Sequence, residues 1–103
     1  GVVMFVSFLG MFFRYWKHRF RREDAAIIDS YGWVLYRLGR NAEALVELRR
    51  AFTLQKDAEI AAHVAEVLWV MGQKDEARRF FEEARKIDPD NRSLQRALEK
   101  TGA

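Results

Sequence analysis

The sequence predicts an all-helical protein built from tandem helical hairpins, and its composition and an internal repeat carry that prediction. The 103-residue chain contains one proline, six glycines and no cysteine, a composition that favours helices. Its residues repeat at an offset of 33 positions, as Val34 with Val67 and Gly39 with Gly72 illustrate. Its charge is uneven, because residues 1–22 carry five basic and no acidic side chains, so the net charge of +3 conceals an acidic remainder.

Nine identities mark the 33-residue repeat. They are Ala25, Ile27, Val34, Leu35, Gly39, Glu43, Ala44, Ala51 and Asp57, which recur as Ala58, Ile60, Val67, Leu68, Gly72, Glu76, Ala77, Ala84 and Asp90. Chance alone would give about two identities over this length. We therefore expect residues 24–103 to hold two repeats, at about 25–57 and about 58–91, followed by a capping helix at about 91–100.

Each repeat is expected to form two helices joined by a short polar link. The first helix should end at a glycine, Gly39 or Gly72, because helices commonly end at a residue in the left-handed conformation. The second helix carries a trio spaced four and then three residues apart, which places its members on one face. The two trios are Ala44, Leu48 and Ala51, and Ala77, Phe81 and Ala84.

A short terminal helix is expected to close the array. Pro89 ends the helix before it, and Asp90 or Asn91 is expected to cap its start. A solenoid needs a polar surface at its exposed end. We expect the outer side of this helix to supply that surface through Arg92, Gln95, Arg96, Glu99 and Lys100.

The order of an aromatic-rich helix, a glycine, a short link, Ala-x3-Leu/Phe-x2-Ala and a proline resembles the tetratricopeptide repeat (TPR) over about residues 25–91. Two positions depart from the family pattern, because Lys56 replaces the usual proline and Ala65 the mid-helix glycine. Residues 29–39 and 59–69 are similar, more narrowly, to the C-terminal repeats of multi-repeat TPR proteins of Gram-negative bacteria, which implies a bacterial protein.

The resemblance implies that the first helices of the repeats line a groove that binds a peptide or a partner helix. The family's groove-facing positions fall on Ala26, Asp29, Trp33, Tyr36, Arg37, Glu59, Ala62, Glu66, Trp69 and Val70. Chaperone-type TPR domains bind a C-terminal carboxylate through Lys, Arg and Asn at such positions, whereas this sequence has Asp29, Trp33 and Glu66. We therefore expect a partner with an apolar surface and basic rims.

Several of these residues have plainer interpretations. Trp33 and Trp69 could equally fill the seam between repeats. We expect the carboxylates of Asp29 and Glu66 to be solvated, as most carboxylates are. His63 shares a helical face with Glu59 and Glu66, but without a second histidine or a cysteine, side-chain pairing along the helix explains it better than a metal site does.

Catalytic motifs are absent from the sequence. It has neither a glycine-rich phosphate loop nor a nucleophile elbow. Its paired carboxylates, such as Glu82 and Glu83, are neighbours on helix surfaces and so diverge. The sequence therefore predicts no enzyme, with no catalytic residue, no metal ligand and no cofactor.

Residues 1–22 differ in character from the repeats. The apolar run at 2–13 is followed at once by a basic and aromatic stretch at 14–22. Twelve helical residues span about 18 Å, short of the roughly 30 Å hydrocarbon core. The run cannot cross a bilayer unaided, and its charges follow the apolar part, unlike those of a signal peptide.

Three interpretations of residues 1–22 stay open. The segment could lie in a membrane interface, with contacts from Phe5, Phe8, Phe12, Arg14, Tyr15, Trp16, Lys17 and Arg21. It could be the end of a longer membrane anchor. It could pack on the repeats, in its own chain or in a second copy, which would give a homo-oligomer.

The sequence as a whole predicts a non-catalytic scaffold for a protein or peptide ligand. The alternative is a protein that acts at a membrane surface through its amphipathic N-terminal helix. Nucleic acid is disfavoured as a partner because the repeats are net acidic and the basic cluster is confined to one helix end. The compartment is left unassigned, with membrane association as one option.

Overall fold

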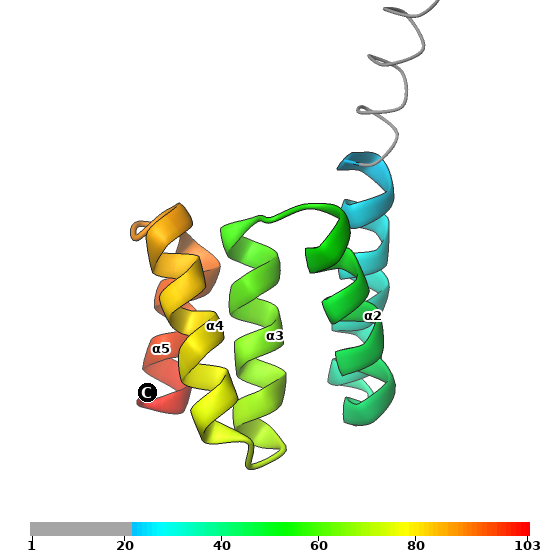
Figure 1. Cartoon of the computed structure of the whole chain (residues 1–103). Coiled ribbons are helices and arrows are strands. Elements are labelled where there is room, and N and C mark those ends of the chain that lie inside the picture. The colour runs from blue at the N-terminus through cyan, green and yellow to red at the C-terminus, as the bar shows by residue number, and fades with distance from the viewer. Residues whose placement is uncertain (1–21) are drawn as a thin grey trace, which may run out of the picture.

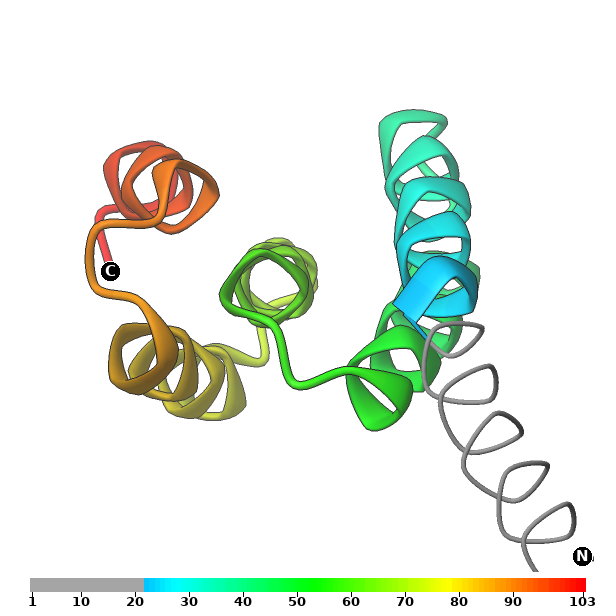
Figure 2. The same cartoon turned by 90° about the horizontal axis from the view of Figure 1, so that it is seen from above.

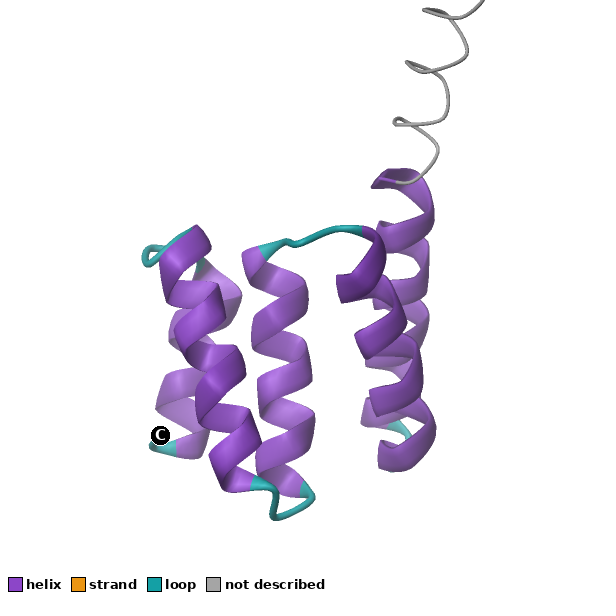
Figure 3. Cartoon of the chain, in the orientation of Figure 1, coloured by secondary structure: helices purple, strands orange, loops and turns teal. Residues whose placement is uncertain are grey.

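The computed structural model describes residues 22–103, and all regular secondary structure in that part of the chain is helical (Figure 3). A first helix runs through residues 22–37. It is followed by α2 (Asn41–Leu54), α3 (Ala58–Val70), α4 (Lys74–Ile87) and α5 (Arg92–Thr101). The predicted all-helical fold of tandem hairpins is confirmed.

The helices form a curved row of two hairpins and a closing helix (Figure 1). The first helix pairs with α2, and α3 pairs with α4. Seen from above, the first helix, α3 and α5 stand on one side of the row, while α2 and α4 stand on the other (Figure 2). Because α3 contacts α2, α4 and α5, it is the central element of the fold.

Left-handed glycines end the first helix of each hairpin, as predicted. Gly39 has φ of 81° and Gly72 has φ of 85°, a conformation in which a side chain would be strained. After the first of them, the N–H of Arg40 donates to the carbonyl of Leu35 at 2.9 Å. The same bond recurs in the second hairpin, so both turns satisfy helix-end carbonyls that would otherwise lack a donor.

The core lies along both sides of α3, of which nine of the 13 residues are buried. On one side Leu48 of α2 meets Val64, Val67 and Leu68. On the other side Phe81 of α4 joins alanines of α3 and two residues of α5. All six members of the two predicted trios are buried, which confirms that each trio lies on one face of its helix.

The terminal helix α5 is capped by Asn91, one of the two predicted caps, whose side chain accepts from the N–H of Leu94 at 3.1 Å. The prediction that its polar side chains lie on the outer side is wrong for Arg96 and Lys100. Leu94 and Ala97 are buried between α3 and α4. That docking turns the adjoining side of α5, with Arg96 and Lys100, toward α3.

The membrane contacts predicted at Phe5, Phe8, Phe12, Arg14, Tyr15, Trp16, Lys17 and Arg21 lie outside the described residues, and so does a homo-oligomer formed through that segment. Within residues 22–103, no helix combines the length and the apolar character that crossing a bilayer requires.

Candidate partner-binding groove

Three hollows follow the side of the row that the first helix, α3 and α5 share, and together we call them the groove. The central hollow has a volume of about 370 Å³ and lies between all three helices. Its lining consists of Asp29, Ser30, Trp33, Val34, Glu59, His63, Glu66, Ser93 and Arg96.

A second hollow lies toward the start of the first helix and a third toward its end. The N-terminal hollow has a volume of about 500 Å³ and is lined by Arg22, Ala25, Ala26, Asp29, Ser30, Gln55, Asp57, Glu59 and Ile60. The C-terminal hollow, of about 310 Å³, is lined by Tyr36, Arg37, Asn41, Val70 and Lys100. The groove therefore extends along the whole described length of the first helix.

Eight of the ten residues predicted to face a groove line one of these hollows. They are Ala26, Asp29, Trp33, Tyr36, Arg37, Glu59, Glu66 and Val70. The other two do not. Ala62 has no exposed surface, so it cannot contact a partner. The half-buried ring of Trp69 lies under Lys74 and Arg78 of α4, with distances of 4.9 Å and 5.3 Å from the charged groups to the ring centre.

Trp33 packs against the neighbouring hairpin and also lines the groove. Its ring stacks on the imidazole of His63, with ring centres 4.2 Å apart, and it lies 5.0 Å from the ring of Tyr36. The rest of its surface lines the central hollow. Trp33 thus joins the first helix to α3 and also leaves apolar surface in the central hollow.

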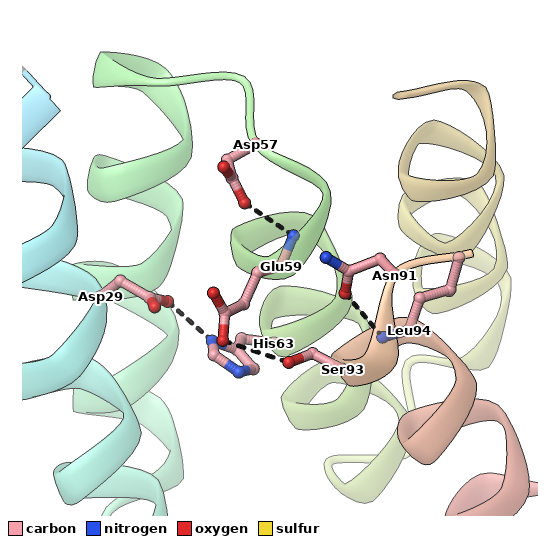
Figure 4. A network of polar contacts seen from close by, with 7 residues as sticks. All are labelled: Asp29, Asp57, Glu59, His63, Asn91, Ser93 and Leu94. Atoms are coloured by element: carbon pink, nitrogen blue, oxygen red, sulfur yellow. Dashed lines mark hydrogen bonds and ion pairs between the residues drawn. The ribbon is translucent and has the colours of Figure 1, made fainter. Parts of the chain in front are cut away.

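Asp29 is buried, so the prediction of a solvated carboxylate is wrong. Its oxygen lies 2.8 Å from Nδ1 of His63, and both side chains are only 12% exposed (Figure 4). The prediction that His63 pairs along its own helix is wrong for the same reason, because its partner comes from the neighbouring hairpin. This contact satisfies a polar group that would be costly to bury alone.

Glu66 is also buried, at 4% exposure, which again contradicts the predicted solvation. Nζ of Lys100 donates to its carboxylate at 3.1 Å and to the hydroxyl of Tyr36 at 3.3 Å. The hydrogen bond to Glu66 raises the pKa of Lys100, while burial, and then the neighbouring Glu66, raise the pKa of Tyr36. Lys100 therefore stays protonated and anchors the end of α5 on α3.

The third acid, Glu59, accepts a hydrogen bond from the hydroxyl of Ser93 at 3.1 Å (Figure 4). The three contacts share one separation, since Asp29 with His63, Glu59 with Ser93 and Glu66 with Lys100 are each 34 residues apart. That is one more than the repeat period. Complementary side chains at this spacing were the sequence signal that would have revealed His63, Ser93 and Lys100.

Comparison with known proteins agrees with this geometry. Residues 33–100, more than half of the chain, match the tetratricopeptide repeat family. The chain is a tetratricopeptide repeat protein. It is 45% identical over 49 residues to the TPR repeat-containing protein PA4667 of Pseudomonas aeruginosa, a match that covers 48% of this chain and 8% of the relative. No solved structure matches it.

TPR repeats typically bind protein partners and typically act as non-catalytic scaffolds. The groove of this TPR protein is mixed in character, with the aromatic rings of Trp33 and Tyr36, exposed valines and several charged side chains. In residues 22–103, no three histidine, cysteine or acidic side chains are grouped so that they would hold a metal ion.

Proposed function

We propose that this TPR protein is a non-catalytic scaffold that binds a peptide or a partner helix along its groove. The observation that supports this most directly is the central hollow, where Trp33 and the 57% exposed Val34 present apolar surface between three helices. Val70, 50% exposed, adds apolar surface in the C-terminal hollow. Rigid aromatic side chains in such positions commonly contribute much of the binding energy of an interface.

The dimensions of the groove suit an extended segment or a single helix. The first helix separates Arg22 in the N-terminal hollow from Arg37 in the C-terminal hollow by about 22 Å, at a rise of 1.5 Å per residue. About seven extended residues cover that length, as does a helix of about four turns. A small metabolite would fill only one of the three hollows.

Selection from a library of random 12-residue peptides displayed on phage, with the full chain as bait, tests the proposal. Selected peptides are synthesised, and their affinities are measured by fluorescence anisotropy for Val34→Gln and Val46→Gln. Both valines are exposed, at 57% and 64%, but only Val34 lines a hollow. We expect Val34→Gln to weaken binding about fivefold or more through lost apolar contact, and Val46→Gln to leave it unchanged.

Both variants should unfold at the wild-type temperature, because each replaces an exposed side chain. The proposal is wrong if no selected peptide binds the wild-type chain. It is also wrong if the two variants lower the affinity equally, because the bound segment would then lie outside the groove.

A further inference from the structure

The acidic side chains of the central hollow are already engaged by the protein itself. Asp29 is held by His63 and Glu66 by Lys100, and both acids are buried. Glu59 accepts from Ser93. The two buried carboxylates, Asp29 and Glu66, therefore have little remaining capacity to attract a cationic partner, whereas Glu59 is exposed beside its hydroxyl donor.

The arginines of the groove, unlike its buried acids, are exposed and have no ion-pair partner in the part of the chain that the structure describes. Each hollow is lined by one arginine: Arg22 in the N-terminal, Arg96 in the central and Arg37 in the C-terminal hollow. By contrast, Arg49 and Arg85, which lie outside the hollows, pair with Glu76 and Glu82.

We propose that the groove binds a peptide segment whose acidic side chains are interspersed with apolar ones, and that Arg96 is its main carboxylate-binding residue. This inference rests on the proposed function. A guanidinium group donates two parallel hydrogen bonds to a carboxylate, which gives both strength and a defined geometry. Arg96 shares its hollow with Trp33 and Val34, so an apolar residue next to the bound acid would find a contact.

The distribution of charge favours carboxylates along a peptide over other anions. Without His63, four acidic and four basic side chains line the three hollows. Because the two signs balance, a polyanion such as a nucleic acid would gain little from long-range attraction. Because the arginines are divided among three hollows, the geometry also suits acidic side chains spaced along the chain better than one terminal carboxylate.

The test uses peptides selected from the phage library and synthesised in three forms. The first is the selected sequence, the second has every Asp and Glu replaced by Asn and Gln, and the third is the selected sequence with an amidated C-terminus. Affinities are measured for the wild-type chain, for Arg96→Gln and for Arg79→Gln. Arg79 is a matched control, since it is an exposed arginine of α4 that lines none of the three hollows.

We expect the selected peptides to be enriched in Asp and Glu, and their amide forms to bind about tenfold more weakly, as the loss of a charge-assisted hydrogen bond implies. Arg96→Gln should weaken the acidic form by a similar factor and leave the amide form unaffected. Arg79→Gln and C-terminal amidation should change neither. Arg96→Glu should regain affinity for a peptide in which one acidic residue is replaced by lysine.

Three results would overturn the inference: no enrichment of acidic residues, equal binding of the acidic and amide forms, or an equal effect of Arg96→Gln on both forms. If Val34→Gln nevertheless weakens binding, the groove is the binding surface and only the acidic partner is refuted. If Val34→Gln has no effect, the proposed function fails together with the inference. Binding lost on C-terminal amidation would show that a terminal carboxylate is bound instead.

Discussion

The two hairpins are related in sequence but differ in what surrounds them. In the second hairpin, α3 has neighbours on both sides, whereas in the first hairpin the helix at residues 22–37 has an exposed apolar face. That face includes Ile27 and Tyr31, which are 67% and 51% exposed, and it continues into Leu38 just after the helix, at 67%. It borders Val34 of the central hollow, which is 57% exposed. At the equivalent positions of α3, Ile60 is 5% exposed and Val67 is fully buried.

This difference shows that a repeated residue does not contribute the same stability in each repeat. Ile27 and Ile60 are the same residue at the same place in the repeat, yet one faces outward and the other is covered by the first hairpin. In a row of hairpins each unit is stabilised by its neighbours. The inner hairpin therefore gains more from an identical apolar side chain than the outer one does.

The largest effect is expected from the matched pair Ile60→Ala and Ile27→Ala. Ile60→Ala removes buried methyl groups and leaves a cavity, which should lower the free energy of unfolding by about 3 kcal/mol. Ile27→Ala changes an exposed residue and should cost less than about 0.5 kcal/mol. Urea unfolding of both variants, with an unchanged dependence on urea concentration, measures the difference.

An equal loss in the two variants would contradict the comparison, because it would mean that the outer face of the first helix is covered in solution. If the stability of Ile27→Ala then varies with protein concentration, a second copy of the chain covers that face. Independence of concentration would point to a segment of the same chain.

The groove side gives a second difference, in the side chain that contacts the buried acid of each hairpin. The first uses His63 for Asp29, while the second uses Lys100 of α5 for Glu66. Lys100→Met should lower the free energy of unfolding by about 1–2 kcal/mol, because it leaves a 6% exposed carboxylate without its cation. Solvent around the half-exposed Lys100 weakens this ion pair, so the loss is smaller than for a fully buried pair.

Lys86→Met is the matched control for this prediction. Lys86 and Glu83 are 3.9 Å apart and both more than half exposed, so the loss of their ion pair should cost less than about 0.5 kcal/mol. If thermal unfolding shows the same small loss for both lysine variants, Lys100 does not stabilise the closing helix through Glu66.

The fold was predictable because its signals are local. Helix ends at Gly39 and Gly72 and the buried trios depend on residues a few positions apart, and such spacings are visible in one sequence. The exposed face of the first helix was not predictable in this way. Its residues match buried ones in the next repeat, and only the position of a unit in the row decides which of them has a neighbour.

The groove was predictable in outline but not in charge. Family positions located Asp29, Trp33 and Glu66 at the hollows, yet counting residue types overestimated the acidity that a partner would encounter. The count missed His63 and Lys100, which come from the neighbouring helices on the groove side and contact the two buried acids. The partner that we propose therefore differs from the one expected from the sequence, because it carries acidic side chains in place of basic rims.

The smallest of the expected effects concerns the pH dependence of stability that the contact between Lys100 and Glu66 produces. In the folded chain the hydrogen bond to Glu66 raises the pKa of Lys100 above its ordinary 10.5, and burial, then Glu66, raises the pKa of Tyr36 above 10.0. Both groups hold their protons more tightly in the folded than in the unfolded state. Their stabilisation is therefore complete below the ordinary values and is lost as pH rises through the folded ones.

Because Lys100 and Tyr36 both keep their protons between about pH 7 and 9, they should not make the unfolding temperature change with pH in that range. Above about pH 10 the unfolding temperature should fall. Lys100→Arg should shift less, because a guanidinium stays protonated across that range and only the contribution of Tyr36 remains. Lys86→Arg replaces an exposed lysine and should follow the wild-type curve. If the curves of Lys100→Arg and the wild type instead fall in parallel, the alkaline loss arises elsewhere and the contact between Lys100 and Glu66 does not hold α5 against α3.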